Sequence, residues 1–193
     1  LKQDWADLAE YADDDLRLQL QGCISAIDVA TVSGSSRALS VVTGNLRANL
    51  LGAVATTHLA LPMLSAGSRI LFVSSGFAFV GPAGYTLYAT AKAGINVFAD
   101  GLRRELLRRK IKVHVTCPGD IDTPMYQGEL RTMPDWIREK MGRAKPMPVD
   151  KAARYILERC FRGKYMIVPS ADACSLATCS GVTSTSPWPI DNS

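Results

Sequence analysis

The sequence has few residues of the kinds that bind metals or build disulfide frameworks. It contains 5 cysteines and 2 histidines among 193 residues, and no two cysteines have the Cys-x-x-Cys spacing of a zinc site. We therefore predict no metal site. The odd number of cysteines favours free or buried thiols in a reducing intracellular compartment, while a bridge between Cys174 and Cys179 stays open.

Long apolar runs and a strong charge of one sign are also missing. No apolar stretch approaches the roughly 18 residues of a membrane-spanning helix. The acidic opening residues, LKQDWADLAEYADDD, lack the pattern of a signal or transit peptide. The formal charge of +4 is too small to indicate a nucleic-acid partner, and the hydrophobic content of 47% is normal for one globular domain. We expect no nucleic acid and no clear membrane span.

Short β-branched runs alternate with longer helical segments. The predicted strands are Ala26–Val32, Arg69–Ser74, Ile111–Thr116 and Tyr165–Val168. The predicted helices are Leu46–Leu64, Tyr85–Arg109 and Val149–Phe161, the last with Asp150 as candidate N-cap. This alternation predicts an α/β fold with a doubly wound parallel sheet over residues 1–170. A Ser-, Thr- and Pro-rich stretch, 171–193, is predicted to be an irregular tail.

The candidate catalytic residues lie near the ends of these strands. Tyr88 and Lys92 are four apart in a helical run, so their side chains share one face. A nearby ammonium stabilises a phenolate, which predicts that Lys92 lowers the pKa of Tyr88 and makes it a general acid–base. Ser75 follows a predicted strand and is placed to hydrogen-bond a substrate oxygen. By itself, the Tyr-x-x-x-Lys spacing also fits a solvated surface pair.

Four segments together resemble the short-chain dehydrogenase/reductase family. They are NLLG from Asn49, RILFVSSG, YATAK and CPGDIDTPM, in that order, and the resemblance runs from about residue 26 to 168. It implies a Rossmann-like fold and an NAD(P)-dependent oxidoreductase. Such an enzyme interconverts a carbonyl and a secondary alcohol by hydride transfer, with a tyrosine as acid–base.

The resemblance also implies a role for each matching catalytic residue. Asn49 matches the helix asparagine that holds a water of the proton relay, and Ser75 matches the serine that orients the substrate. Ser74 is the less favoured choice because it lies off the spacing. Tyr88 matches the acid–base, and Lys92 the residue that lowers its pKa. A plain helix cap is the alternative role for Asn49.

A second set of matches concerns the cofactor, NADP or NAD, with NADP slightly preferred. Tyr88 and Lys92 match residues beside the nicotinamide ribose. Pro118 and Gly119 match the turn that approaches the nicotinamide, and Thr123 matches the hydroxyl that holds its carboxamide. The alternatives are a strand end for the turn and a turn cap for Thr123. The two histidines, His58 and His114, are interpreted as structural.

The family's Gly-rich diphosphate turn has no match. Thr43 and Gly44 have the wrong spacing to the next glycine, and Ser33 and Gly34 stand where the family has an Asn-Asn-Ala-Gly motif. We therefore expect an N-terminally incomplete fold that lacks the first βαβ units. Two interpretations stay open: the chain is the catalytic part of a longer enzyme, or it is a non-catalytic subunit or scaffold that has lost cofactor binding.

A narrower resemblance is to 3-ketodihydrosphingosine reductases. It rests on the segment PGDIDTPMYQGELRTMP, with matches at Pro118, Asp120, Asp122, Thr123, Pro124, Glu129, Thr132 and Pro134. It implies a lid over a lipid-like carbonyl substrate, whereas a generic family loop is the alternative. The resemblance to the family also implies a homodimer or a subunit of a larger assembly. The small residues Ala91, Ala93 and Gly94 would allow close packing between subunits.

Overall fold

The structure is a computed structural model. It describes residues 42–82, 84–135, 137–138, 145–170 and 173. The chain divides into two compact units, one ending at Met63 and the other beginning at Leu64. The predicted strand Ala26–Val32, the Ser33–Gly34 pair and, apart from Ala173, the predicted tail lie outside the described residues.

The described part of the first unit is helical from residue 42 to residue 63. Ordinary helix at 42–46 widens into the π-helical segment η1 (Arg47–Leu51), continues as α4 (Gly52–Ala60) and ends in the 3-10 turn η2 (Leu61–Met63). Thr43 and Gly44 therefore lie inside a helix. This agrees with the sequence-based view that they form no phosphate-binding turn.

The second unit carries the sheet. Its elements in chain order are β1 (Arg69–Val73), the 3-10 turn η3 (Gly76–Ala78), α5 (Thr86–Glu105), β2 (Lys112–Thr116), β3 (Ile121–Asp122), α6 (Pro124–Thr132), β4 (Met147–Pro148), α8 (Val149–Phe161) and β5 (Met166–Ile167). Helix α5 stops before the predicted Arg109 because residues 106–110 form turns, and Lys110 takes a left-handed φ of 54°. The predicted helix Val149–Phe161 has the predicted ends.

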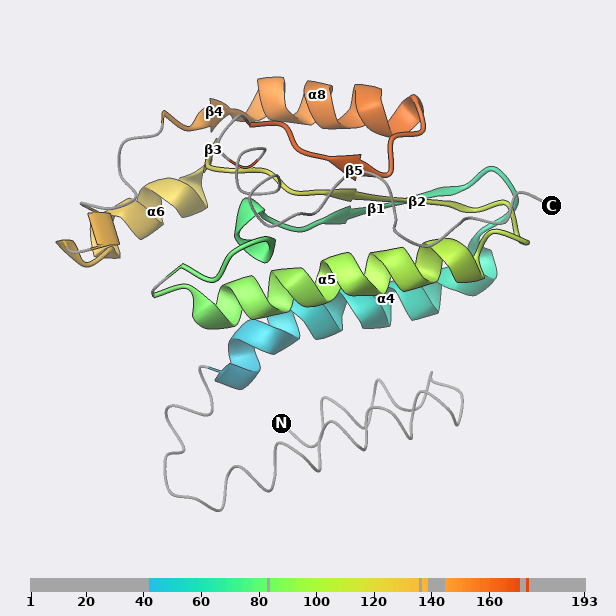
Figure 1. Ribbon diagram of the computed structural model, residues 1–193, viewed down its shortest axis with the longest axis horizontal. Helices are drawn as coiled ribbons and strands as arrows, with labels where there is room; N and C mark the ends of the chain where they lie inside the picture. Colours follow the sequence, from blue (N-terminus) through green and yellow to red (C-terminus); the bar gives the residue numbers. More distant parts are fainter. Residues whose placement is uncertain (1–41, 83, 136, 139–144, 171–172, 174–193) are drawn as a thin grey trace, which may run out of the picture. The chain divides into compact units, whose positions relative to one another are not determined.

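Strands β1, β2 and β5 form a parallel sheet in the order β1-β2-β5. Arg69 of β1 pairs with Lys112 of β2, and Val115 of β2 pairs with Met166 of β5. In Figure 1, α5 covers one face of this sheet and α8 covers the other. Strand β2 is buried from Val113 to Thr116 because helices cover both its faces. The doubly wound parallel arrangement is therefore confirmed.

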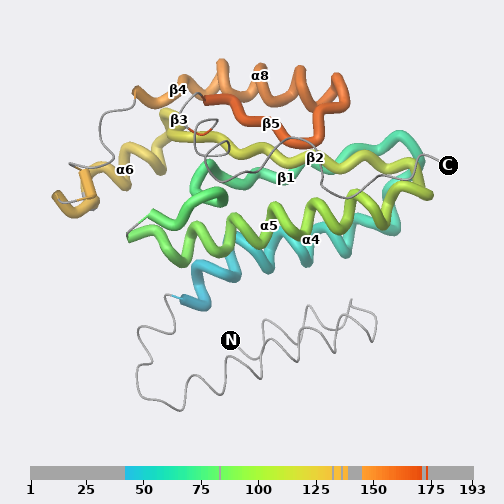
Figure 2. The backbone as a smooth tube through the Cα atoms, viewed as in Figure 1, coloured from blue at the N-terminus to red at the C-terminus, as the bar shows by residue number. Residues whose placement is uncertain are grey.

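The long loop after β2 has a closed base. Strands β3 and β4 pair in parallel, and the Met147 amide donates to the Asp120 carbonyl at 2.9 Å. Helix α6 lies within this loop, as the tube in Figure 2 shows. The two ends of the loop are therefore held together by the β3–β4 pair. A loop fixed in this way can cover the edge of the sheet.

One predicted cap is wrong. Pro148, and not Asp150, is the N-cap of α8, and no side chain caps that end. Asp150 lies in the first turn, where a carboxylate still interacts favourably with the helix dipole. Among the described residues, no helix combines the length and the apolar character needed to cross a bilayer.

Candidate active site

The carboxyl ends of the parallel strands come together at one edge of the sheet. Beyond β1, the Ser74 amide donates to the Thr116 carbonyl at 2.8 Å and the Gly76 amide to the Pro118 carbonyl at 2.7 Å. These bonds extend the ladder past the ends of both strands. The two segments that follow β1 and β2, with Ser75 in one and Gly119 in the other, are therefore held side by side.

Helix α5 presents Tyr88 and Lys92 to this edge, one turn apart as predicted. The Lys92 ammonium donates to the Val73 carbonyl at 3.1 Å, and its Nζ lies 5.5 Å from the centre of the Tyr88 ring. At the backbone, the buried Ser74 hydroxyl donates to the Lys92 carbonyl at 2.9 Å. The end of β1 thus holds both the side chain and the main chain of Lys92.

Ser75 completes a cluster of three polar groups. Its backbone is extended two residues beyond the end of β1, and its hydroxyl accepts the Phe77 amide at 3.2 Å, which caps the turn η3. The Ser75 side chain also acts on Tyr88, because hydrogen bonding from Ser75 lowers the pKa of the phenol. The Phe77 ring packs edge-on against the Tyr88 ring at 6.3 Å. Ser75, Tyr88 and Lys92 therefore meet in one place.

The pKa of Tyr88 differs in direction from the sequence-based prediction. Burial raises the pKa of Tyr88 above its ordinary value, the Ser75 hydrogen bond lowers it, and the carboxylates of Glu129 and Asp120 raise it further. The pKa of Lys92 is lowered, chiefly because burial disfavours its charge. The Lys92 ammonium is directed to a carbonyl and to the face of the tyrosine ring. In this geometry the protonated phenol is favoured.

Asn49 belongs to the first unit, whereas the other three predicted catalytic residues belong to the second. It lies in the π-helical segment η1, and wide turns of this type occur frequently at functional sites. Its amide nitrogen lies 3.2 Å from the Asn45 carbonyl and 3.5 Å from the Asn45 side-chain oxygen. No side chain caps α4, so the alternative that Asn49 is a helix cap is not seen.

The predicted cofactor turn is closely packed. A Cβ on Gly119 would lie 2.6 Å from the Ser170 hydroxyl oxygen, so only glycine fits without a shift. The Gly119 amide donates to that hydroxyl at 3.2 Å, and Pro118 is buried. Thr123 caps α6, because its hydroxyl accepts the Tyr126 amide at 3.1 Å. The structural alternatives for these residues are thus realised, and their cofactor roles stay predictions.

Sequence reasoning missed a second layer of residues around this cluster. Tyr85, just before α5, donates its hydroxyl to Glu129 of α6. Cys117 is fully buried, and its thiol donates to the Asn96 side chain at 3.6 Å. Burial raises the pKa of this thiol to about 11, which keeps it protonated. The spacing of Tyr85, one turn before Tyr88, was the available signal for the first pair.

The comparisons with known proteins agree with this fold and arrangement. The family model for short chain dehydrogenases matches residues 34–134, just over half of the chain. The chain therefore belongs to the short-chain dehydrogenase family. Among the described residues, no group of three or more histidine, cysteine, aspartate or glutamate side chains is arranged to hold a metal ion.

Two curated relatives illustrate the range of similar proteins. The chain is 37% identical over 101 residues to a 3-ketodihydrosphingosine reductase of Dictyostelium discoideum, covering 52% of this chain and 30% of that protein. It is 35% identical over 120 residues to carbonyl reductase family member 4 of Danio rerio, covering 58% of this chain and 48% of that protein. The chain thus spans less than half the length of either relative.

Solved structures support the fold. A short chain dehydrogenase from Burkholderia cenocepacia, crystallised with NADP, matches with a TM-score of 0.61 and 22% identity over 72% of this chain and 55% of that one. A relative from Burkholderia phymatum, crystallised with NAD, matches with a TM-score of 0.53 and 13% identity over 74% and 60%. At these identities the likeness establishes the Rossmann-type α/β fold.

Proposed function

We propose that this chain carries the catalytic part of an NAD(P)-dependent oxidoreductase that interconverts a carbonyl and a secondary alcohol. The observation that supports it most is the meeting of Ser75, Tyr88 and Lys92 at the carboxyl edge of a parallel sheet. Ligands of open α/β sheets bind at that edge. Membership of the short-chain dehydrogenase family makes this chemistry the natural candidate.

In this mechanism Tyr88 is the proton donor for reduction. Its O–H bond breaks as the substrate carbonyl oxygen gains charge, and the proton passes to that oxygen. Ser75 acts on the same phenol, so its hydroxyl lies where it can also bind the substrate oxygen. A positioned acid of this kind contributes roughly 10²–10⁴-fold to the rate. Asn49 is proposed to hold a water that returns the proton.

The side chains of Lys92 and Thr123 fit a nicotinamide cofactor. An ammonium has three donors, and the Val73 carbonyl takes one, which leaves others to bind ribose hydroxyls. The Thr123 hydroxyl accepts from Tyr126 and keeps its own proton to donate to a carboxamide. Pro118 and Gly119 would form the wall beside the ring. When bound, the cofactor supplies the hydride; the choice between NADP and NAD is left to the experiment.

The proposed substrate is a ketone on a long, lipid-like chain. Relatives are named 3-ketodihydrosphingosine reductase and 3-oxoacyl-[acyl-carrier-protein] reductase, and both names describe a keto group at the third carbon of such a chain. Helix α6 and its anchored loop would cover this substrate. A homodimer stays a prediction, and Ala91, one of its proposed contacts, has no exposed surface.

The direct test is Tyr88→Phe, which removes only the phenolic oxygen. We expect carbonyl reduction, followed by loss of NADPH or NADH absorbance with 3-ketodihydrosphingosine, to fall at least about 100-fold. The matched control is Tyr155→Phe on α8, whose hydroxyl contacts only the Val168 carbonyl among the hydrogen bonds described (3.4 Å). Near wild-type turnover by Tyr88→Phe would overturn the proposed mechanism.

A cofactor titration separates the enzyme from the scaffold interpretation. Binding to the native state raises the melting temperature by mass action. We expect NADPH or NADH to raise the melting temperature of the protein, and Lys92→Met to reduce that shift. No shift at millimolar concentrations of either cofactor would favour a family member that has lost cofactor binding.

A further inference from the structure

A hydrogen bond joins the long loop to the start of the catalytic helix. Tyr85 is the N-cap residue of α5, and its hydroxyl donates to the carboxylate of Glu129 in α6. Both ends of this link are fixed. The Tyr85 carbonyl accepts the Ala89 amide at 2.8 Å, while Thr123 caps the other end of α6. The bond therefore holds α6 against the N-terminal end of α5.

The Phe77 ring connects Tyr85 to Tyr88, because it packs against both tyrosine rings. The Phe77 ring lies 5.0 Å from the Tyr85 ring and 6.3 Å from the Tyr88 ring, centre to centre. Phe77 also bonds through its amide to Ser75. A displacement of α6 that pulls Tyr85 away would therefore disturb the packing around both Tyr88 and Ser75.

The charge of Glu129 also acts on Tyr88. The groups that face Tyr88 are the carboxylate of Glu129 from α6, the carboxylate of Asp120 from the turn after β2, and Lys92 from its own helix. Both carboxylates raise the pKa of Tyr88, and they also raise the pKa of Tyr126, which lies between them in sequence. Burial is the largest cause of the raised pKa of Tyr88, and the negative potential of the two carboxylates adds to it.

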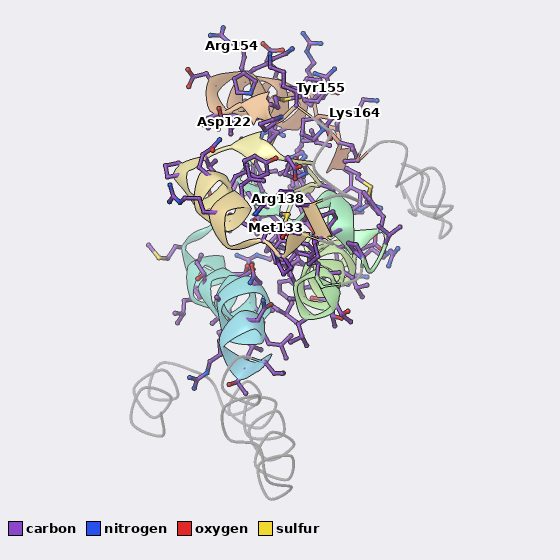
Figure 3. The ribbon with its side chains drawn as sticks, turned by 90° about the vertical axis from the view of Figure 1, so that its left-hand side faces the viewer. Asp122, Met133, Arg138, Arg154, Tyr155 and Lys164 are labelled. Atoms are coloured by element: carbon purple, nitrogen blue, oxygen red, sulfur yellow. The ribbon has the colours of Figure 1, made fainter. Side chains whose placement is uncertain are left out.

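Local hydrogen bonds satisfy both ends of α6. The Arg138 guanidinium folds back and donates to the carbonyls of Leu130 and Met133, at 3.1 and 2.9 Å, which satisfies the C-terminal end of α6. Figure 3 labels Arg138 and Met133 close together below Asp122. At the other end, Gln127 donates to the Asp122 carboxylate at 2.7 Å. Glu129 is thus presented from a helix secured at both ends.

We propose that Glu129 is a positioning residue for the reaction: by accepting the Tyr85 hydroxyl it docks α6 beside the start of α5, and it places a negative charge near Tyr88 that opposes ionisation of the phenol. The inference rests on the proposed function. In reduction, the hydride comes from the reduced nicotinamide and the proton from Tyr88, so charge and atoms balance. In alcohol oxidation Tyr88 must first lose its proton, and the carboxylate opposes that step.

The test separates the charge from the hydrogen bond. In Glu129→Gln the amide oxygen can still accept from Tyr85, but the negative charge is gone. We expect the titration midpoint of Tyr88, followed by the ¹³C resonance of its labelled Cζ, to move to lower pH by up to about one unit. The pH at which alcohol oxidation begins should fall with it. Glu158→Gln, on the exposed surface of α8, is the control and should move neither.

Tyr85→Phe tests the docking. It keeps the ring against Phe77 and removes only the hydroxyl, so we expect KM for the carbonyl substrate to rise about tenfold with a smaller change in kcat. Glu129→Asp retains the charge on a shorter stem and should raise KM while shifting the Tyr88 midpoint less than Glu129→Gln. An unmoved Tyr88 midpoint in Glu129→Gln, or an unchanged KM in Tyr85→Phe, would overturn the inference.

Failure of this inference is distinguishable from failure of the proposed function. The NMR titration of Tyr88 requires neither cofactor nor turnover, so it reports on Glu129 in an inactive protein as well. Conversely, if Tyr88→Phe remained active, the proposed function would fail even with the midpoint of Tyr88 under the control of Glu129. The two results therefore address different statements about the same site.

Discussion

Two polar clusters lie on the same sheet and are built in different ways. At the carboxyl edge, the side chains of Tyr88 and Lys92 are only half-buried. At the middle of β2, His114 is 2% exposed and its two ring nitrogens are both engaged. Nδ1 lies 2.6 Å from the Lys164 carbonyl, and Nε2 lies 3.2 Å from the Arg69 guanidinium.

The difference lies in what remains available for chemistry. A carbonyl can only accept and a guanidinium can only donate, so the His114 ring must be neutral, with its proton on Nδ1. Both of its nitrogens are then hydrogen-bonded within the fold, to Arg69 and to the Lys164 carbonyl, and neither is available to a ligand. Lys92, in contrast, gives one of three donors to a carbonyl and keeps others at an accessible edge. A satisfied buried group stabilises the fold, and a partly used group at a strand end can act on a ligand.

The largest effect in this comparison is expected from Lys92→Met. The substitution keeps the length of the stem and removes the ammonium, so catalytic efficiency should fall roughly 10²–10³-fold, as for loss of one preorganised donor. Steady-state kinetics measure the catalytic efficiency, and a urea unfolding curve shows whether the variant keeps its stability. Lys112→Met, at the exposed start of β2, is the matched control. Equal losses of activity in both variants would contradict the assignment.

The complementary effect is expected from His114→Leu. Leucine leaves the Lys164 carbonyl without its donor, and the free energy of unfolding should fall by about 2 kcal/mol. The activity per folded molecule should stay near the wild-type value, because His114 lies away from the strand ends. His58→Leu, which changes the other histidine, is the control. A drop in kcat without loss of stability would place His114 in the site after all.

These clusters also mark what the sequence could and could not predict. The sheet was predictable because short apolar runs such as Ile70–Val73 place apolar residues on both faces, a pattern typical of buried parallel strands. The pairing of Tyr88 with Lys92 was predictable from the helical repeat. The place of Ser75 followed from its position after a strand, since parallel strands end at one edge.

Long-range contacts could not be predicted in this way. The bond from Tyr85 to Glu129 joins residues 44 apart, and no periodicity relates a helix start to a loop helix. The direction of the Tyr88 pKa was missed for a similar reason: burial, which is its largest cause, and the carboxylates of Glu129 and Asp120 come from the tertiary structure and not from the helical repeat. The role of Ser74 was also hidden, because two adjacent serines look alike in a sequence.

Between pH 7 and pH 5, the pH dependence of stability should follow His114. Burial lowers the pKa of His114, and the charges of Arg69 and Lys112 lower it further. Below the ordinary histidine pKa of about 6.5 the unfolded chain therefore binds a proton that the native chain does not. The free energy of unfolding should decline as the pH falls from 7 toward 5. His114→Leu should lose part of this decline; a slope equal to that of the wild type would contradict the prediction.

The smallest effect is expected from Ser74→Ala, and it connects the two kinds of cluster. The Ser74 hydroxyl is buried like His114, yet the carbonyl it binds is that of Lys92. Its loss removes one hydrogen bond, so the free energy of unfolding should fall by about 1 kcal/mol. Because Lys92 is held less firmly, the KM for cofactor should rise more than kcat falls. Ser68→Ala, just before β1, is the control, because it also removes a hydroxyl that makes one hydrogen bond, in this case with the Ser65 amide. An unchanged KM with reduced stability would make Ser74 a purely structural residue, like His114.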